Sequence, residues 1–150
     1  MQSLDDNLNE TFLQHMENAN KKNVSIQLKS SERIRLHADW TLLYKMFDYI
    51  LNNAVKFSPE NETVIVSTQI HDQVCQIKFI DKGKGLPEND LEFIFDPFAI
   101  KNIQNHQAGQ GLSLSISRHI MLHHGGTIFA SNHPGGGTCI TCEFPLSDIK

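Results

Sequence analysis

Three short segments of this 150-residue chain hold residues whose types and spacing suit the binding of a nucleotide. Residues 52–58 read Asn-Asn-Ala-Val-Lys-Phe-Ser and offer an amide oxygen and a cation within one helical turn. Residues 81–85 read Asp-Lys-Gly-Lys-Gly, and residues 109–112 read Gly-Gln-Gly-Leu. Together the three segments supply an oxygen for a metal ion, a carboxylate for a base and bare backbone for phosphates.

The first segment lies on a predicted helix, where it sets a candidate metal ligand beside a candidate phosphate ligand. One face of this helix, next to its apolar stripe, carries Tyr49, Asn53, Lys56 and Phe57. Magnesium bound to nucleotide phosphates takes hard oxygen ligands, often only one or two of them from protein. Asn53 is therefore a candidate metal ligand and Lys56 a partner for phosphate charge. The alternative for Asn53 is a structural amide near a helix end.

The second segment begins with Asp81, which we expect at the end of a buried strand. A buried carboxylate is costly unless a donor reaches it, and the exocyclic amine of adenine is such a donor. Gly83 and Gly85 would let a ligand lie against the backbone. The alternative is a simple strand-ending turn, because Asp and Gly are common in turns.

The third segment places Gly109 and Gly111 at the start of a predicted helix. Free N–H groups and the helix dipole at such a start suit a triphosphate. No Gly-Lys-Ser/Thr follows, which excludes a Walker A loop, and no strand directly precedes it, which argues against a Rossmann turn. A plain helix start after a loop is the alternative.

The composition narrows the class of protein. Apolar residues make up 39% and charged residues 20% of the chain, as in ordinary soluble domains. The net charge of −4 argues against nucleic acid or an anionic membrane as a partner of this domain. Cys139 and Cys142 form a C-x-x-C in a predicted strand, where an offset of three points side chains to opposite faces. We expect ordinary strand cysteines in a reduced, cytoplasmic setting.

Apolar periodicity predicts an α+β domain of two layers, and strands are expected near residues 24–28, 34–36, 64–70, 74–80, 127–130 and 138–144. The first predicted helix ends near residue 20 or 23, and its apolar residues are Leu4, Leu8, Phe12, Leu13 and Met16. Other helices are expected from an Asp39 N-cap to just before Pro59, over residues 87–95, and from residue 109 or 110 to 123. Because the strands cluster as hairpins, we expect a mixed, mostly antiparallel sheet covered on one face by about three helices.

Taken together, these segments resemble the ATP-binding catalytic domain of sensor histidine kinases, within the GHKL ATPase superfamily. The similarity runs from about residue 30 to 146. The matching motifs are the N box (residues 52–58), the G1 box (81–85), the F box Ile-Phe-Asp-Pro-Phe (94–98), the G2 box (109–114) and the closing strands around residues 124–128 and 135–146.

The resemblance implies a Bergerat fold that binds ATP and Mg²⁺. It assigns magnesium to Asn53, the phosphates to Lys56, the adenine ring to Phe57 and the adenine amine to Asp81. It makes residues 99–108 an ATP lid, whose cation is Lys101. The other residues that it places in the nucleotide pocket are Gly83, Gly85, Phe95, Gly109, Gln110, Gly111, Leu112 and Thr138.

The resemblance also implies partners. We expect residues 1–22 to form a helix leading in from a dimerisation domain, and residues 23–150 to form the catalytic domain. The phosphoacceptor histidine would lie on a dimerisation or histidine-phosphotransfer domain of the same or a partner kinase, and a response regulator receiver domain would follow. The expected location is cytoplasmic, which includes the cytoplasmic part of a membrane-bound sensor.

Departures from the family pattern shape the expected chemistry. Tyr49 stands where gyrase-like ATPases have a Glu base, so we expect phosphoryl transfer to a histidine rather than activation of water. Ser113 replaces a common glycine, and the lid has one cation. Tyr49 and this lid also motivate the alternative, a degenerate non-catalytic nucleotide-binding or docking module of a signalling protein.

Overall fold

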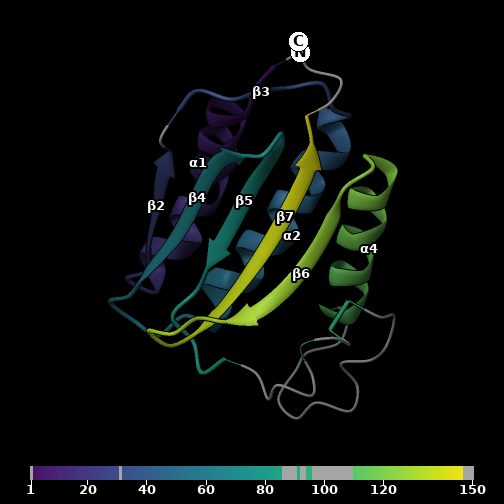
Figure 1. Cartoon of the computed structure of the whole chain (residues 1–150). Helices are drawn as coiled ribbons and strands as arrows, with labels where there is room; N and C mark the ends of the chain where they lie inside the picture. The colour runs from purple at the N-terminus through teal and green to yellow at the C-terminus, as the bar shows by residue number, and fades with distance from the viewer. Residues whose placement is uncertain (1, 31, 86–90, 92–93, 96–109, 147–150) are drawn as a thin grey trace.

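The computed structural model describes residues 2–30, 32–85, 91, 94–95 and 110–146, with the backbone alone for residues 110–113. A five-stranded sheet forms one layer, and helices pack on one of its faces to form the other (Figure 1). This arrangement is the predicted α+β sandwich. The helices are α1 (Leu4–Lys21), α2 (Trp40–Phe57) and α4 (Gln110–His123), and the strands are β2 (Ser25–Ser30), β4 (Thr63–His71), β5 (Val74–Ile80), β6 (Thr127–Asn132) and β7 (Thr138–Pro145).

The sheet has the strand order β2-β4-β5-β7-β6. Strand β2 pairs parallel with β4, because helix α2 crosses between them, and the other neighbouring pairs are antiparallel. The predicted hairpin is confirmed as β4–β5, with His71 opposite Val74. A second, two-stranded sheet joins β1 (Gln2–Ser3) to β3 (Arg35–Leu36). The expected mixed, mostly antiparallel sheet is therefore confirmed.

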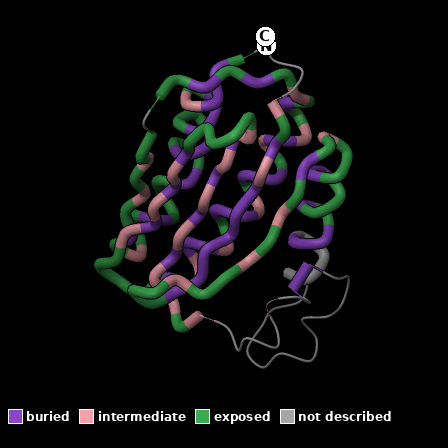
Figure 2. The backbone as a smooth tube through the Cα atoms, viewed as in Figure 1, coloured by how far each residue is buried: buried purple, intermediate pink, exposed green. Residues whose placement is uncertain are grey.

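The pleat of the strands decides which side chains meet the helices. Along β5, Cys75, Ile77 and Phe79 are buried and alternate with half-buried residues (Figure 2). The ring of Phe79 lies 5.9 Å from that of Phe47 on α2, centroid to centroid. The core thus lies between the sheet and its helices.

Helix α2 is the central helix, with contacts to both α1 and α4. Asp39 caps its start as predicted, because its carboxylate accepts a hydrogen bond of 3.2 Å from the Leu42 amide. The helix ends at Phe57, where the Ser58 amide donates to the Ala54 carbonyl at 3.1 Å. Its buried stripe packs on the sheet and consists of Trp40, Leu43, Met46, Phe47, Ile50, Leu51, Ala54 and Val55.

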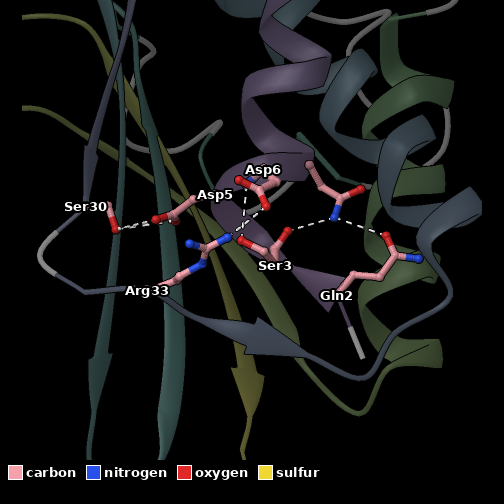
Figure 3. A network of polar contacts seen from close by, with 7 residues as sticks. Gln2, Ser3, Asp5, Asp6, Ser30 and Arg33 are labelled. Carbon is pink, nitrogen blue, oxygen red and sulfur yellow. Dashed lines mark hydrogen bonds and ion pairs between the residues drawn. The ribbon is translucent and has the colours of Figure 1, made fainter.

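Helix α1 packs into the same core and is anchored at its start by polar contacts (Figure 3). The Ser3 hydroxyl caps the helix by accepting from the Asp6 amide at 3.3 Å. Arg33 forms an ion pair of 3.0 Å with Asp6, and the Ser30 hydroxyl donates to Asp5 at 3.2 Å. The contacts hold the helix against the segment between β2 and β3. The proposed domain boundary after residue 22 stays a prediction.

The buried face of α1 differs in part from the expectation. Leu4, Leu8 and Phe12 are buried as expected, but Leu13 is 69% exposed and Met16 is 46% exposed. At the helical spacing, the rest of the buried face of α1 consists of polar and small residues, which are Asn7, Thr11, His15 and Ala19.

The cysteines are free and buried. Burial raises the pKa of Cys75 to about 12 and also raises the pKa of Cys142, so both remain thiols. In the described residues, no group of three or more His, Cys, Asp or Glu side chains is placed to hold a metal ion. No helix in the same part of the chain is long and apolar enough to cross a membrane.

Candidate functional site

Two of the three predicted segments meet where α2 ends, β5 ends and β7 begins. The Asp81 amide donates to the Thr138 carbonyl at 3.0 Å, which joins the end of β5 to the start of β7. The Lys82 amide donates to the hydroxyl of Ser58 at 3.3 Å, which joins the same segment to the end of α2. The fold therefore brings together residues that are far apart in the sequence.

Asp81 lies at the centre of this junction. Its side chain is 9% exposed, and its Oδ1 atom accepts hydrogen bonds from the amides of Gly83 at 2.9 Å and Thr138 at 3.1 Å. Burial raises the pKa of Asp81 above its ordinary value, and the two backbone hydrogen bonds act against that rise. The carboxylate is thus both desolvated and fixed in orientation.

Two glycines, Gly83 and Gly137, allow the end of α2, the end of β5 and the start of β7 to approach one another closely. A Cβ atom on Gly83 would lie 2.7 Å from the carbonyl oxygen of Phe57. One on Gly137 would lie 2.0 Å from the carbonyl oxygen of Asp81, and Gly137 also has a φ of +92°. Neither position has room for a side chain. Gly85, a predicted pocket residue, has a φ of +78°, which glycine adopts without strain.

The last turns of α2 carry the side chains that are predicted to bind phosphate and magnesium. Asn53 and Lys56 are half-buried, whereas the neighbouring Asn52 is exposed. The ring of Phe57 is 46% exposed at the end of the helix. Tyr49 lies half-buried one turn before Asn53. These side chains therefore sit on the helix end that Ser58 joins to the Asp81 segment.

Other predicted residues lie elsewhere or outside the described part. Phe95 is buried and lines a cavity of about 350 Å³, whose other walls include Arg118 and Leu122 on α4 and residues 127–130 on β6. Lys101, Gly109 and most of the predicted helix at residues 87–95 lie outside the described residues. The described backbone places Gln110, Gly111 and Leu112 in the first turn of α4, which confirms the predicted helix start.

Sequence reasoning did not single out two residues of this junction. Ser58 is fully buried, and its hydroxyl accepts a hydrogen bond from the Lys82 amide. The only feature of the sequence that could have indicated it is its position at the end of the predicted helix, before Pro59. Gly137 packs against the backbone of Asp81. The feature of the sequence that could have indicated it is the run of three glycines before Thr138. Both residues became recognisable only once the strand pairing was known.

Comparison with known proteins shows what this chain is similar to. The family model described as histidine kinase-, DNA gyrase B- and HSP90-like ATPase matches residues 38–148. Sensor protein KdpD of Escherichia coli (strain K12) is 36% identical over 110 residues, which cover 73% of this chain and 12% of KdpD. Sensor histidine kinase WalK of Bacillus subtilis (strain 168) is 33% identical over 114 residues, which cover 73% of this chain and 19% of WalK.

Solved structures show the same fold. The catalytic domain of histidine kinase ThkA superposes with a TM-score of 0.84 at 25% identity, over 97% of each chain. A structure of ThkA in complex with response regulator protein TrrA superposes with a TM-score of 0.82 at 24% identity, over 99% of this chain and 42% of that one. The chain thus matches a catalytic domain over 97% of its length, whereas it spans 12% of KdpD and 19% of WalK.

The packing of Gly137 yields a first prediction. We expect Gly137→Ala to lower the free energy of unfolding by about 1–3 kcal/mol more than Gly136→Ala. Both positions have positive φ, of +92° and +101°, so both variants carry backbone strain, but a Cβ on Gly136 meets nothing within 4 Å. Urea unfolding of both variants measures the difference. Equal losses would show that the contact with Asp81 does not constrain the site.

Proposed function

Because the chain belongs to the family of histidine kinase-, DNA gyrase B- and HSP90-like ATPases, we propose that it is the Mg-ATP-binding catalytic domain of a two-component sensor histidine kinase. It would position the γ-phosphate of ATP for transfer to a histidine on a separate dimerisation domain. The observation that carries this proposal is the buried Asp81, held at the end of the helix that bears Asn53 and Lys56.

We assign the adenine base to Asp81. The Gly83 and Thr138 amides both bond to Oδ1, so among these contacts Oδ2 is left for the exocyclic amine of adenine. A donor at that oxygen would offset the desolvation that raises the pKa of this carboxyl. The half-exposed ring of Phe57 would pack on the base, and the Thr138 side chain would lie beside it.

We assign the phosphates and magnesium to the last turns of α2 and the start of α4. An amide oxygen from Asn53 suits Mg²⁺, which takes few protein ligands when phosphates supply the rest. Lys56 and the amino end of α4 would add positive potential. Bound magnesium would neutralise phosphate charge.

The proposed reaction needs positioning more than proton removal. A neutral imidazole nitrogen attacks the γ-phosphorus, an N–P bond forms, the bond to the β-phosphate oxygen breaks and ADP leaves. The phosphorylated ring then releases the proton of its other nitrogen to water. This nucleophile requires no general base for its activation, which fits the presence of Tyr49 one helical turn before Asn53. Activation of water would need a general base such as the Glu of gyrase-like ATPases, and this chain has Tyr49 at that position.

The proposed partners follow from the same reaction. The acceptor is a dimerisation or histidine-phosphotransfer domain, of the same or a partner kinase, and the phosphoryl group then passes to a response regulator receiver domain. The solved complex of ThkA with a response regulator shows such a partner for that kinase. A cytoplasmic location is part of this proposal.

Transfer to histidine tests the function directly. The chain is incubated with γ-labelled Mg-ATP and the dimerisation domain of its parent protein, and we expect label on the acceptor that is stable to base and lost in acid. ATP binding without transfer would support the degenerate module instead. Steady ATP hydrolysis by the chain alone would indicate an ATPase of the gyrase type.

The raised pKa of Asp81 predicts how nucleotide binding depends on pH. Binding needs the ionised carboxylate, so ATP affinity should fall on acidification at a higher pH than for an ordinary aspartate. Asp81→Asn should weaken ATP binding by about 1–3 kcal/mol and remove this acid-side loss. Calorimetric titrations across a pH series measure both effects. Unchanged affinity in the variant would refute the adenine assignment.

The metal assignment predicts a selective effect of Asn53→Asp. We expect this variant to change the magnesium dependence of ATP binding and to leave ADP binding without magnesium nearly intact. Asn52→Asp is the matched control, because it adds the same charge at the exposed neighbouring position. Titrations with and without Mg²⁺ separate the two variants. An equal loss of magnesium-free ADP binding in Asn53→Asp would count against a metal ligand.

A further inference from the structure

Lys22, the residue that follows α1, reaches across to the end of α2. Its ammonium nitrogen donates to the carbonyl oxygens of Val55 at 3.1 Å and Lys56 at 2.5 Å. The last carbonyls of a helix have no amide partner within that helix, and the helix dipole favours a cation beside them. Lys22 therefore caps the end of α2 from another helix.

The turn that Lys22 caps is the one that carries the proposed phosphate residues. Lys56 and Phe57 belong to it, and Asn53 lies one turn before Phe57. The same end of the helix also meets the Asp81 segment, because Ser58 accepts from the Lys82 amide and the Gly83 backbone packs against the Phe57 carbonyl. The turn is thus fixed between Lys22 and the segment that orients Asp81.

Helix α1 holds Lys22 in place because it is fixed along α2. The buried His15 on α1 lies 2.7 Å from the Asp48 carboxylate on α2, between Nε2 and Oδ1. The Tyr44 hydroxyl on α2 contacts the Asn7 side chain and bonds to Glu10 at 2.9 Å. These links set the position of α1 against α2, and the contacts at the start of α1 hold it against the segment between β2 and β3 (Figure 3).

The residue after Lys22 adds a backbone hydrogen bond to the same region. The Asn61 amide donates to the Asn23 carbonyl at 2.9 Å, just beyond the end of α2. The junction between α1 and β2 therefore touches the chain both within the last turn of α2 and after it. A shift of this junction would move the end of α2 with it.

We propose that Lys22 is a positioning residue of the nucleotide site, which acts through the last turn of α2 on Lys56 and Asn53. This inference rests on the proposed Mg-ATP binding and adds the residue that couples α1 to it. Without the ammonium group, the Val55 and Lys56 carbonyls lose this donor and the turn loosens at its end. Phosphate-dependent affinity then falls, while the fold persists.

The test compares Lys22→Met with Lys21→Met. Lys21 is the adjacent lysine, its side chain is 71% exposed, and it pairs with Glu17 at 3.7 Å on its own helix. We expect Lys22→Met to weaken Mg-ATP binding about 3–10-fold, Lys21→Met to bind as the wild type does, and Lys22→Arg to restore most of the affinity. Thermal unfolding of the three variants confirms that they are folded.

Amide hydrogen exchange gives a readout specific to the turn. In Lys22→Met, the Phe57 and Ser58 amides should exchange faster than in Lys21→Met, because their hydrogen bonds close the last turn of α2. Wild-type affinity and exchange in Lys22→Met would overturn the inference and leave the proposed function standing. A wild-type protein that binds no Mg-ATP would overturn the proposed function and, with it, the role of this contact.

Discussion

The candidate site depends on one constraint, the burial of the Asp81 carboxylate at the end of a strand. A carboxylate removed from water needs donors, and the Gly83 and Thr138 amides supply them. To do so, β7 must begin against the end of β5, and Gly137 must lie where no Cβ atom fits. The raised pKa of Asp81 follows from this burial, and the glycine at position 137 and the pairing of β7 with β5 are what make the burial possible.

Helix α2 connects the buried carboxylate to the rest of the domain. Its apolar stripe binds it to the sheet, so the position of its end follows from the packing of side chains such as Phe47 on Phe79. Ser58 then joins that end to the Asp81 segment, and Lys22 joins it to α1. The side chains proposed for phosphate and magnesium thus sit on a rigid element, which suits a site that acts by positioning.

Local patterns in the sequence predicted most elements of the fold. The Asp39 cap, the hairpin around residues 71–74 and the helix that starts at Gln110 depend on neighbouring residues, and all three are confirmed. The parallel pairing of β2 with β4 depends on contacts between distant residues, which periodicity does not encode. For α1, apolar spacing wrongly favoured Leu13 and Met16 over the polar residues that occupy the buried stripe.

The residues of the candidate site also fall into those that the sequence indicated and those that depend on contacts between distant parts of the chain. Residue types and spacing indicated Asp81 and Gly83, the family resemblance added Thr138, and the structure brings the three into contact. Lys22 carries no local signal, because its partners are backbone carbonyls on another helix. Phe95 was predicted for the pocket, but the structure places it at the cavity beside α4 and β6, and its role in nucleotide binding stays a prediction.

The most direct test of the account is a titration of the isotope-labelled chain with a non-hydrolysable ATP analogue and Mg²⁺, followed by NMR. The account predicts that the Gly83 and Thr138 amides shift together with one dissociation constant, and that the Asn53 side-chain amide shifts only when magnesium is present. Shifts confined to the cavity lined by Phe95 and Arg118, or no shifts, would contradict it.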